Sequence, residues 1–189
     1  MTKEKKINKT TIDQKEHDKF FKMAEEWWDP NGKFKTLHKF NPVRIAFIRE
    51  KIINHFNINP SDENPFNKIS LLDVGCGGGL LCEPMSKLGA NVTGIDIVEK
   101  NIKTASAHAE GNKLPIKYQV NTVEELATKK TKYDVILNME VIEHVSDVSL
   151  FIKSCSHLLS KDGIMIFASL NRTLTSYGLA IIGVEYILG

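Results

Sequence analysis

The stretch LLDVGCGGGLLCEPMSKLGANVTGID, residues 71–96, decides the fold. An apolar run over Ile69–Val74 leads into four glycines between Gly75 and Gly79, and a second apolar run closes on Asp96. Glycines let the backbone turn sharply and approach a ligand closely, and the N-terminus of a following helix presents free N–H groups. The pattern predicts a buried strand, a ligand-binding glycine loop, a helix and a second strand. A tight turn that binds nothing is the less favoured interpretation.

The same alternation of short apolar runs and amphipathic segments continues along the chain. We expect strands over 69–74, 91–95, 116–120, 133–139 and 164–170, and helices over 80–88, 96–110, 123–128 and 148–159. Parallel strands need crossover connections, and strands that are apolar throughout need cover on both faces. The fold class is therefore α/β, a doubly wound parallel sheet. Ligands of such sheets bind at the carboxyl ends of the strands.

Two helices are expected ahead of this sheet. The first covers 12–28 and has an aromatic face, and the second runs from Asn41 to Phe56, because Asn can cap a helix and Pro suits its first position. The chain divides into a flexible basic tail (1–14), an N-terminal helical segment with a polar linker (15–67) and an α/β domain (68–189).

Composition excludes several classes of protein. A chain of 189 residues with 42% hydrophobic and 25% charged residues is an ordinary globular domain, neither disordered nor fibrous. The net charge of +2 gives no reason to expect nucleic-acid binding. Cys76, Cys82 and Cys155 lack the close pairs of zinc sites and fit a reducing compartment. No apolar segment follows the basic start, so we expect no secretory signal peptide and a cytoplasmic location.

Two acidic residues flank the glycine loop. Asp96 lies 21 positions after Gly75, where an acid can accept hydrogen bonds from both hydroxyls of an adenosine ribose. NAD and S-adenosylmethionine (SAM) both contain that ribose, so Asp96 does not distinguish them, and an exposed turn is the alternative. Asp73, two positions before Gly75, favours SAM, because a carboxylate suits an ammonium group and repels a diphosphate.

Polar residues also follow the third and fourth expected strands. Thr122 could lie near an adenine ring, although a helix cap with Glu125 three residues on is the more ordinary interpretation. Glu140, Glu143 and His144 would point into one space if they shared a helical turn. Two carboxylates and an imidazole can bind a divalent metal ion or act as a general base. A solvated acidic turn is the alternative.

Four segments carry a resemblance to a known family. They are WWDPNGKFKTLHKFNPVR (27–44), LLDVGCGGGLLCEPMSKLGANVTGID (71–96), YDVILNMEVIEHV (133–145) and SLNRTLTSYGLAIIGVEYILG (169–189). With them the chain resembles the ubiquinone-biosynthesis O-methyltransferases of bacteria and mitochondria. The glycine segment alone indicates only a methyltransferase, whereas the first and last segments are specific to this family.

The resemblance implies a Rossmann-like, SAM-dependent methyltransferase fold with N-terminal helices. The implied reaction is methylation of a phenolic hydroxyl on polyprenylated catechol or hydroxyphenol intermediates. The expected cofactor-binding residues are Arg44, Asp73, Gly75, Gly77, Asp96, Thr122 and Met139, of which Arg44, Gly75, Asp96 and Met139 are SAM contacts that the resemblance maps. The divalent ion of the family, usually magnesium, maps onto Glu140, Glu143 and His144.

Methyl transfer to a phenol requires a phenolate, although a phenol ionises only near pH ~10. We expect Glu143 and His144 to be the catalytic residues. A metal ion on the catechol oxygens, with His144 as one ligand, is the preferred route to the phenolate. Direct proton abstraction by His144 is the alternative.

Residues 174–188 are apolar but too short to span a bilayer. We expect this segment to cover the active site and to touch the membrane surface, which would make the protein peripheral on the inner face of the cytoplasmic membrane. A buried helix with no membrane role is the alternative. The expected partners are a polyprenylated phenol or quinol, this surface and other ubiquinone-biosynthesis proteins, but no nucleic acid.

Members of the resembled family continue beyond the position of Gly189 with two further strands. We therefore expect a truncated chain whose last strands are missing and whose sheet has an unfinished edge. A non-catalytic SAM-binding remnant is one alternative. A nucleotide-binding oxidoreductase is another, which Asp73 disfavours.

Overall fold

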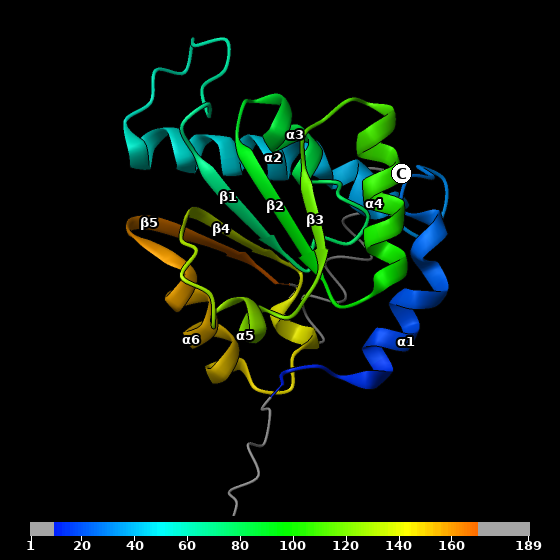
Figure 1. Cartoon of the computed structure of the whole chain (residues 1–189). Coiled ribbons are helices and arrows are strands. Elements are labelled where there is room, and N and C mark those ends of the chain that lie inside the picture. The colour runs from blue at the N-terminus through cyan, green and yellow to red at the C-terminus, as the bar shows by residue number, and fades with distance from the viewer. Residues whose placement is uncertain (1–9, 170–189) are drawn as a thin grey trace, which may run out of the picture.

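The five apolar runs form one parallel sheet in a computed structural model that describes residues 10–169 (Figure 1). The strand order is β3-β2-β1-β4-β5. The strands are β1 (Ser70–Val74), β2 (Asn91–Asp96), β3 (Lys117–Val120), β4 (Tyr133–Met139) and β5 (Leu159–Ala168). Every neighbouring pair is parallel. The order reverses beside β1, so the loops after β1 and β4 open a crevice at the carboxyl ends of the strands.

Helices cover both faces of the sheet, which confirms the doubly wound α/β prediction. The helices are α1 (Gln14–Met23), α2 (Lys35–Phe56), α3 (Cys82–Lys87), α4 (Glu99–Gly111), α5 (Val123–Leu126) and α6 (Val148–Leu158), with 3-10 turns η1 (Ala24–Glu26) and η2 (Ile142–His144). One face packs against α2, α3 and α4, and the other against α5 and α6 (Figure 1). Among the described residues, no helix is long and apolar enough to cross a membrane.

The side chains of successive strand residues lie on opposite faces of the sheet. Leu71 joins the apolar cluster with Ile52 of α2 and Met85 of α3, whereas Leu72 joins the cluster with Phe151 of α6. All five side chains are at most 2% exposed. The central strands are thus buried on both sides, as their uninterrupted apolar sequence requires.

Side chains cap the starts of α5 and α6, and the cap by Thr122 was expected from the sequence. The hydroxyl of Thr122 accepts a hydrogen bond from the Glu125 N–H at 3.1 Å and begins α5. The carboxylate of Asp147 accepts one from the Leu150 N–H at 2.9 Å and begins α6. These caps satisfy N–H groups that a helix start leaves unpaired.

Both helices ahead of the sheet differ from their predicted bounds. The first α-helix ends at Met23, and η1 then leads to the two tryptophans. The start of the second at Asn41 was wrong, because α2 begins at Lys35 and contains Pro42 in its interior. Asn41 does not cap this helix, since its side chain donates to the carbonyl of Leu80 at 2.9 Å.

The last described strand is also longer than predicted. It begins at Leu159, directly after α6. Residues 160–163 belong to the strand because the pairing between β5 and β4 shifts its register across them. The pairing passes from Tyr133 opposite Leu159 to Val135 opposite Ile164. The polar sequence SKDG reads as a loop, and only the pairing with β4 makes it part of a strand.

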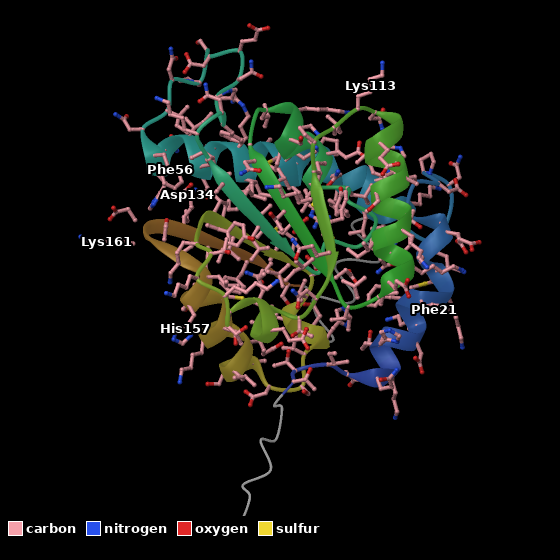
Figure 2. The ribbon with its side chains drawn as sticks, in the orientation of Figure 1. Phe21, Phe56, Lys113, Asp134, His157 and Lys161 are labelled. Carbon is pink, nitrogen blue, oxygen red and sulfur yellow. The ribbon has the colours of Figure 1, made fainter. Side chains whose placement is uncertain are left out.

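The polar groups described at the amino ends of the central strands bond to one another. Asp134 accepts hydrogen bonds from the N–H and hydroxyl of Ser70 at 2.9 and 2.7 Å, and from the hydroxyl of Ser160 at 3.1 Å. Asp134 and Phe56 both lie toward this end of the sheet in Figure 2. The opposite, carboxyl end carries the crevice.

Candidate active site

A cavity of about 230 Å³ lies at the carboxyl ends of the strands. Its walls come from the loops after β1, β2, β3 and β4, and from α1 and α2. The predicted site residues that line it are Arg44, Asp73, Gly75, Gly77, Asp96, Thr122, Met139, Glu140 and His144. Glu143 is the one predicted residue outside this lining. Residues as far apart in the sequence as Arg44 and His144 thus surround one space.

The glycine loop owes its shape to positive φ angles. Gly75 has φ +68° and Gly77 has φ +54°, a region that side chains rarely adopt. The N–H of Gly75 donates to the carbonyl of Ile95 at 2.8 Å, which ties the loop to the end of β2. A Cβ atom on Gly77 would overlap the indole ring of Trp27. Glycine is therefore required here by the backbone and by the residue packed on it.

Asp96 is fixed by three hydrogen bonds. Its Oδ2 accepts from the Gly77 N–H at 2.9 Å, and its Oδ1 accepts from the Val98 N–H at 2.8 Å and from Asn101 Nδ2 at 3.3 Å. Burial raises the pKa of Asp96, whereas these donors and His17 lower it. A carboxylate offers about four acceptor sites. The remaining capacity, on Oδ2, is available to a ligand hydroxyl.

Arg44 and Asp73 place opposite charges beside the loop. Burial lowers the pKa of Arg44, while the negative charges of Asp73 and Glu140 raise it. Burial raises the pKa of Asp73 to about 6, against the thiol of Cys82, which donates at 3.2 Å, and against Arg44. Arg44 Nε is buried without a hydrogen-bond partner. A half-buried cation whose Nε donor is buried and unused, beside a buried anion, suits a ligand that carries both charges, such as an amino acid.

The end of β4 differs from the predicted helical turn. Glu140 has a positive φ of 60°, and the chain then forms the short η2 turn. His144 faces α1: its Nδ1 lies 2.9 Å from Glu16 Oε2, and its ring meets Phe20 edge-on at 5.4 Å. Across residues 10–169, no three His, Cys, Asp or Glu side chains are grouped to hold a metal ion.

The predicted magnesium site at Glu140, Glu143 and His144 is therefore not supported. A left-handed residue followed by a 3-10 turn does not place positions three and four apart on one face, as a regular helical turn would. These residues do not fit a divalent ion in the described arrangement.

The N-terminal part of the chain covers the cavity. Sequence analysis did not predict this cover, which we call the roof. The roof residues in its lining are Thr11, Ile12, Asp13, Glu16, His17, Phe20 and Trp27. Thr11 donates from its hydroxyl to Glu124 at 2.7 Å, and Ile12 pairs with Val145. Phe20 lines the cavity, whereas the neighbouring Phe21 is 47% exposed on the outer side of α1 (Figure 2).

One local signal for this roof was present in the sequence. Asp13 followed by Glu16 is a helix-start pattern, and the Asp13 side chain does accept from the Lys15 N–H at 2.8 Å. The pattern predicts a helix start there but not its position over the strand ends. That position depends on contacts with Glu124 and Val145, which are more than 100 residues away.

Comparisons with known proteins agree with this geometry. A family profile described as "Methyltransferase domain" matches residues 72–167. The chain is 60% identical over 178 residues to the ubiquinone biosynthesis O-methyltransferase of Pelagibacter ubique (strain HTCC1062), covering 94% of this chain and 73% of that protein. It is 54% identical over 180 residues to the protein of that name from Bartonella tribocorum, covering 95% of this chain and 73% of that protein.

Solved structures share the fold. The PH0226 protein from Pyrococcus horikoshii OT3 superposes with a TM-score of 0.59 at 18% identity, over 79% of this chain and 64% of that chain. A SAM-dependent methyltransferase from Clostridium acetobutylicum ATCC 824 also gives 0.59 at 19% identity, over 92% of this chain and 61% of that chain. At these identities the likeness concerns the fold alone.

Proposed function

The chain belongs to the ubiquinone biosynthesis O-methyltransferase family, and from that premise we propose how its residues bind SAM and methylate a phenol. The chain is a SAM-dependent O-methyltransferase. The proposed substrate is a quinol-type molecule, a polyprenylated catechol or hydroxyphenol, methylated on a phenolic hydroxyl. One observation supports the site most strongly: the half-buried Arg44, the buried Asp73 and a fixed Asp96 line the same cavity as the glycine loop.

The charged pair is proposed to bind the amino-acid end of SAM. Arg44 would bind the carboxylate through its unused buried donor, and Asp73 would bind the ammonium group. The backbone of Gly75 lines the same cavity and would let this end of the ligand approach closely. Neutralisation of each buried charge by its counterpart on the ligand would favour both ionised forms.

The other end of the ligand is proposed to lie against β2, β3 and β4. Asp96 would accept from a ribose hydroxyl, and Gly77 holds the carboxylate in place through its N–H. Met139, 8% exposed at the end of β4, offers a soft sulfur surface for the adenine ring. Thr122 would meet the same ring, with its hydroxyl oxygen already accepting from Glu125 N–H.

Bound SAM supplies the methyl group: its S–CH₃ bond breaks as the O–CH₃ bond forms, which leaves S-adenosylhomocysteine and releases the phenolic proton to a base. We assign that base to His144. Glu16 lies beside Nδ1 and would favour a proton on that nitrogen, which leaves Nε2 as the acceptor. The carboxylate of Glu16 would also stabilise the imidazolium that forms when Nε2 takes the phenolic proton. Phe20 packs edge-on against the ring. No step runs through a metal ion, because the described residues do not fit one.

The roles of Asp96 and His144 separate in one experiment. Asp96→Ala should weaken SAM binding by about 1.5–3 kcal/mol, the cost of leaving a buried ligand hydroxyl unpaired. His144→Asn should keep SAM affinity while turnover of a prenylated catechol falls. Isothermal titration and transfer of a radiolabelled methyl group measure the two effects. Unchanged SAM affinity in folded Asp96→Ala, or full turnover in His144→Asn, would contradict the assignment.

We also propose that the protein works peripherally on a membrane surface. A polyprenyl tail dissolves in the bilayer, so the phenol would be presented to the cavity from there. The segment 174–188, predicted to touch the membrane, lies outside the described residues. Contact with other ubiquinone-biosynthesis proteins remains part of this proposal. Sedimentation with anionic liposomes, compared with neutral ones, tests the association, and no binding to either would contradict it.

A further inference from the structure

Trp27 is linked through one buried side chain to the carboxylate of Asp96, the proposed ribose-binding group. It follows η1, is 8% exposed, and donates from its indole Nε1 to Asn101 Oδ1 at 2.8 Å. Asn101, on α4, is 1% exposed and donates from Nδ2 to Asp96 Oδ1 at 3.3 Å. A continuous chain of hydrogen bonds therefore runs from Trp27 through Asn101 to Asp96. It joins positions 27, 101 and 96, which no local sequence pattern connects.

The chemistry of the three groups fixes the direction of this chain. An indole nitrogen can only donate a hydrogen bond, so Asn101 must present its oxygen to Trp27. The amide NH₂ group then necessarily faces Asp96. Without the indole donor, neither of the other two groups prevents the amide of Asn101 from turning its oxygen toward the carboxylate of Asp96. Two acceptors would then face and repel each other. Trp27 thus sets which end of Asn101 the carboxylate meets.

The same indole also supports the other side of Asp96. Its ring packs on Gly77 and Gly78, where an added Cβ atom would overlap it, and stacks on Phe34 at 3.8 Å between ring centroids. Gly77 is the residue whose N–H donates to Asp96 Oδ2. One side chain therefore bears on both oxygens of the carboxylate, by a hydrogen-bond chain to Oδ1 and by packing on the donor to Oδ2.

We propose that Trp27 and Asn101 are positioning residues for Asp96, which orient its carboxylate toward the ribose hydroxyls of SAM. This inference rests on the proposed role of Asp96 in binding the ribose. It gives a function to Trp27, the first residue of the segment 27–44 that carries the family resemblance. Neither side chain needs to touch the reacting atoms.

The experiment uses Trp27→Phe, which keeps an aromatic ring over the glycine loop and removes only the indole N–H. Asn101→Leu removes both ends of the amide, and Asn101→Asp keeps an acceptor for Trp27 but presents oxygen to Asp96. Trp28→Phe is the matched control, because it deletes an indole N–H that donates to the carbonyl of Gly78 at 2.9 Å instead.

The ligands are S-adenosylhomocysteine and its 2′,3′-dideoxy analogue, titrated into the full chain. Trp27→Phe and Asn101→Leu should each weaken S-adenosylhomocysteine about tenfold, the scale of one hydrogen bond to a charged group. Neither should weaken the dideoxy analogue more than about twofold, because Asp96 has no hydroxyl to hold there. The double variant should be no weaker than Asn101→Leu alone, and Trp28→Phe should not discriminate between the ligands.

Equal losses for both ligands in Trp27→Phe would mean a general structural role and would overturn the inference, as would unchanged affinity or fully multiplicative losses in the double variant. If Trp27→Phe does not fold, the comparison of Asn101→Leu with Asn101→Asp decides: only the inference predicts that the aspartate variant binds S-adenosylhomocysteine more weakly while the two match on the analogue. Asp96→Ala separates the premise. If it discriminates between the ligands and Trp27→Phe does not, the inference fails but the ribose assignment stands; if Asp96→Ala does not discriminate, the assignment itself fails.

Discussion

Replacing Asp73 with Asn tests whether a buried carboxylate binds the ammonium group of SAM. Asp73 is 3% exposed, and burial raises its pKa from 3.8 to about 6, although Cys82 and Arg44 oppose the rise. Because the pKa in the folded protein is raised, stability present below pH 3.8 is lost as pH increases through about 6. At roughly 1.36 kcal/mol per pKa unit, ionised Asp73 costs the SAM-free protein about 3 kcal/mol at neutral pH.

Bound SAM should offset this cost, because an ammonium group favours the ionised carboxylate. If only the ionised form binds SAM, the apparent Kd of the wild-type protein rises about twofold at pH ~6 and roughly tenfold at pH ~5, relative to pH ~8. Asp73→Asn should bind SAM about 1.5–3 kcal/mol more weakly at pH ~8, and its affinity should lose this dependence on pH. Any acid dependence that persists would belong to Asp96, whose pKa burial also raises.

Isothermal titration at several pH values, in two buffers of different ionisation enthalpy, measures both the affinity and the protons released. At pH ~6 the wild-type protein should release about half a proton on binding SAM, and Asp73→Asn none from this site. Thermal unfolding without SAM is the companion measurement: Asp73→Asn should be the more stable protein at pH ~8, with the difference closing toward pH ~4. A wild-type affinity that is constant from pH ~5 to ~8, or a variant that keeps the wild-type profile, would refute this reasoning.

Further predictions concern the base, the loop and a buried glutamate. His144→Asn should lower methyl transfer about 10²–10⁴-fold at unchanged SAM affinity, and if His144 is a direct base, exhaustive chelation should leave wild-type turnover intact. Gly77→Ala, at φ +54° and against Trp27, should lower the thermal midpoint and SAM affinity together, as differential scanning fluorimetry would show. Glu83 is 2% exposed and hydrogen-bonded to the partly exposed His108, so replacing it with Ala should lower the free energy of unfolding in urea by about 1.5–3 kcal/mol, the scale of a hydrogen bond to a charged group; a loss below about 1 kcal/mol would contradict this.

The parts of the site that the sequence predicted are those fixed by local backbone pattern. Gly75 and Gly77 follow a buried strand and need positive φ, and Asp96 ends the next strand, so their meeting follows from parallel pairing alone. Met139 enters the cavity for the same reason, at the end of β4. The carboxyl ends of adjacent parallel strands must come together, whatever the rest of the chain does.

The parts that the sequence did not predict depend on distant contacts or on one backbone angle. The prediction of a metal site assumed a regular helical turn after β4, and the left-handed Glu140 removes that turn. The roof of Thr11, Glu16 and Phe20 is held by Glu124 and His144, which lie far along the chain. No periodicity in residues 10–28 indicates which surface that helix covers.

The two tryptophans explain why a glycine loop shared by many methyltransferases is accompanied here by a family-specific N-terminal segment. A loop of four glycines has little side-chain packing of its own, so its conformation must be stabilised from outside. Trp27 packs on Gly77 and Gly78 and donates a hydrogen bond to Asn101, while Trp28 donates to Gly78 O and stacks on His108 at 3.5 Å between ring centroids. The boundary predicted after residue 67 separates two sequence patterns, but the proposed SAM site draws on both sides of it. The glycine loop supplies the N–H of Gly77 that donates to Asp96, and the tryptophans of the N-terminal segment pack on the loop and hold that donor in position.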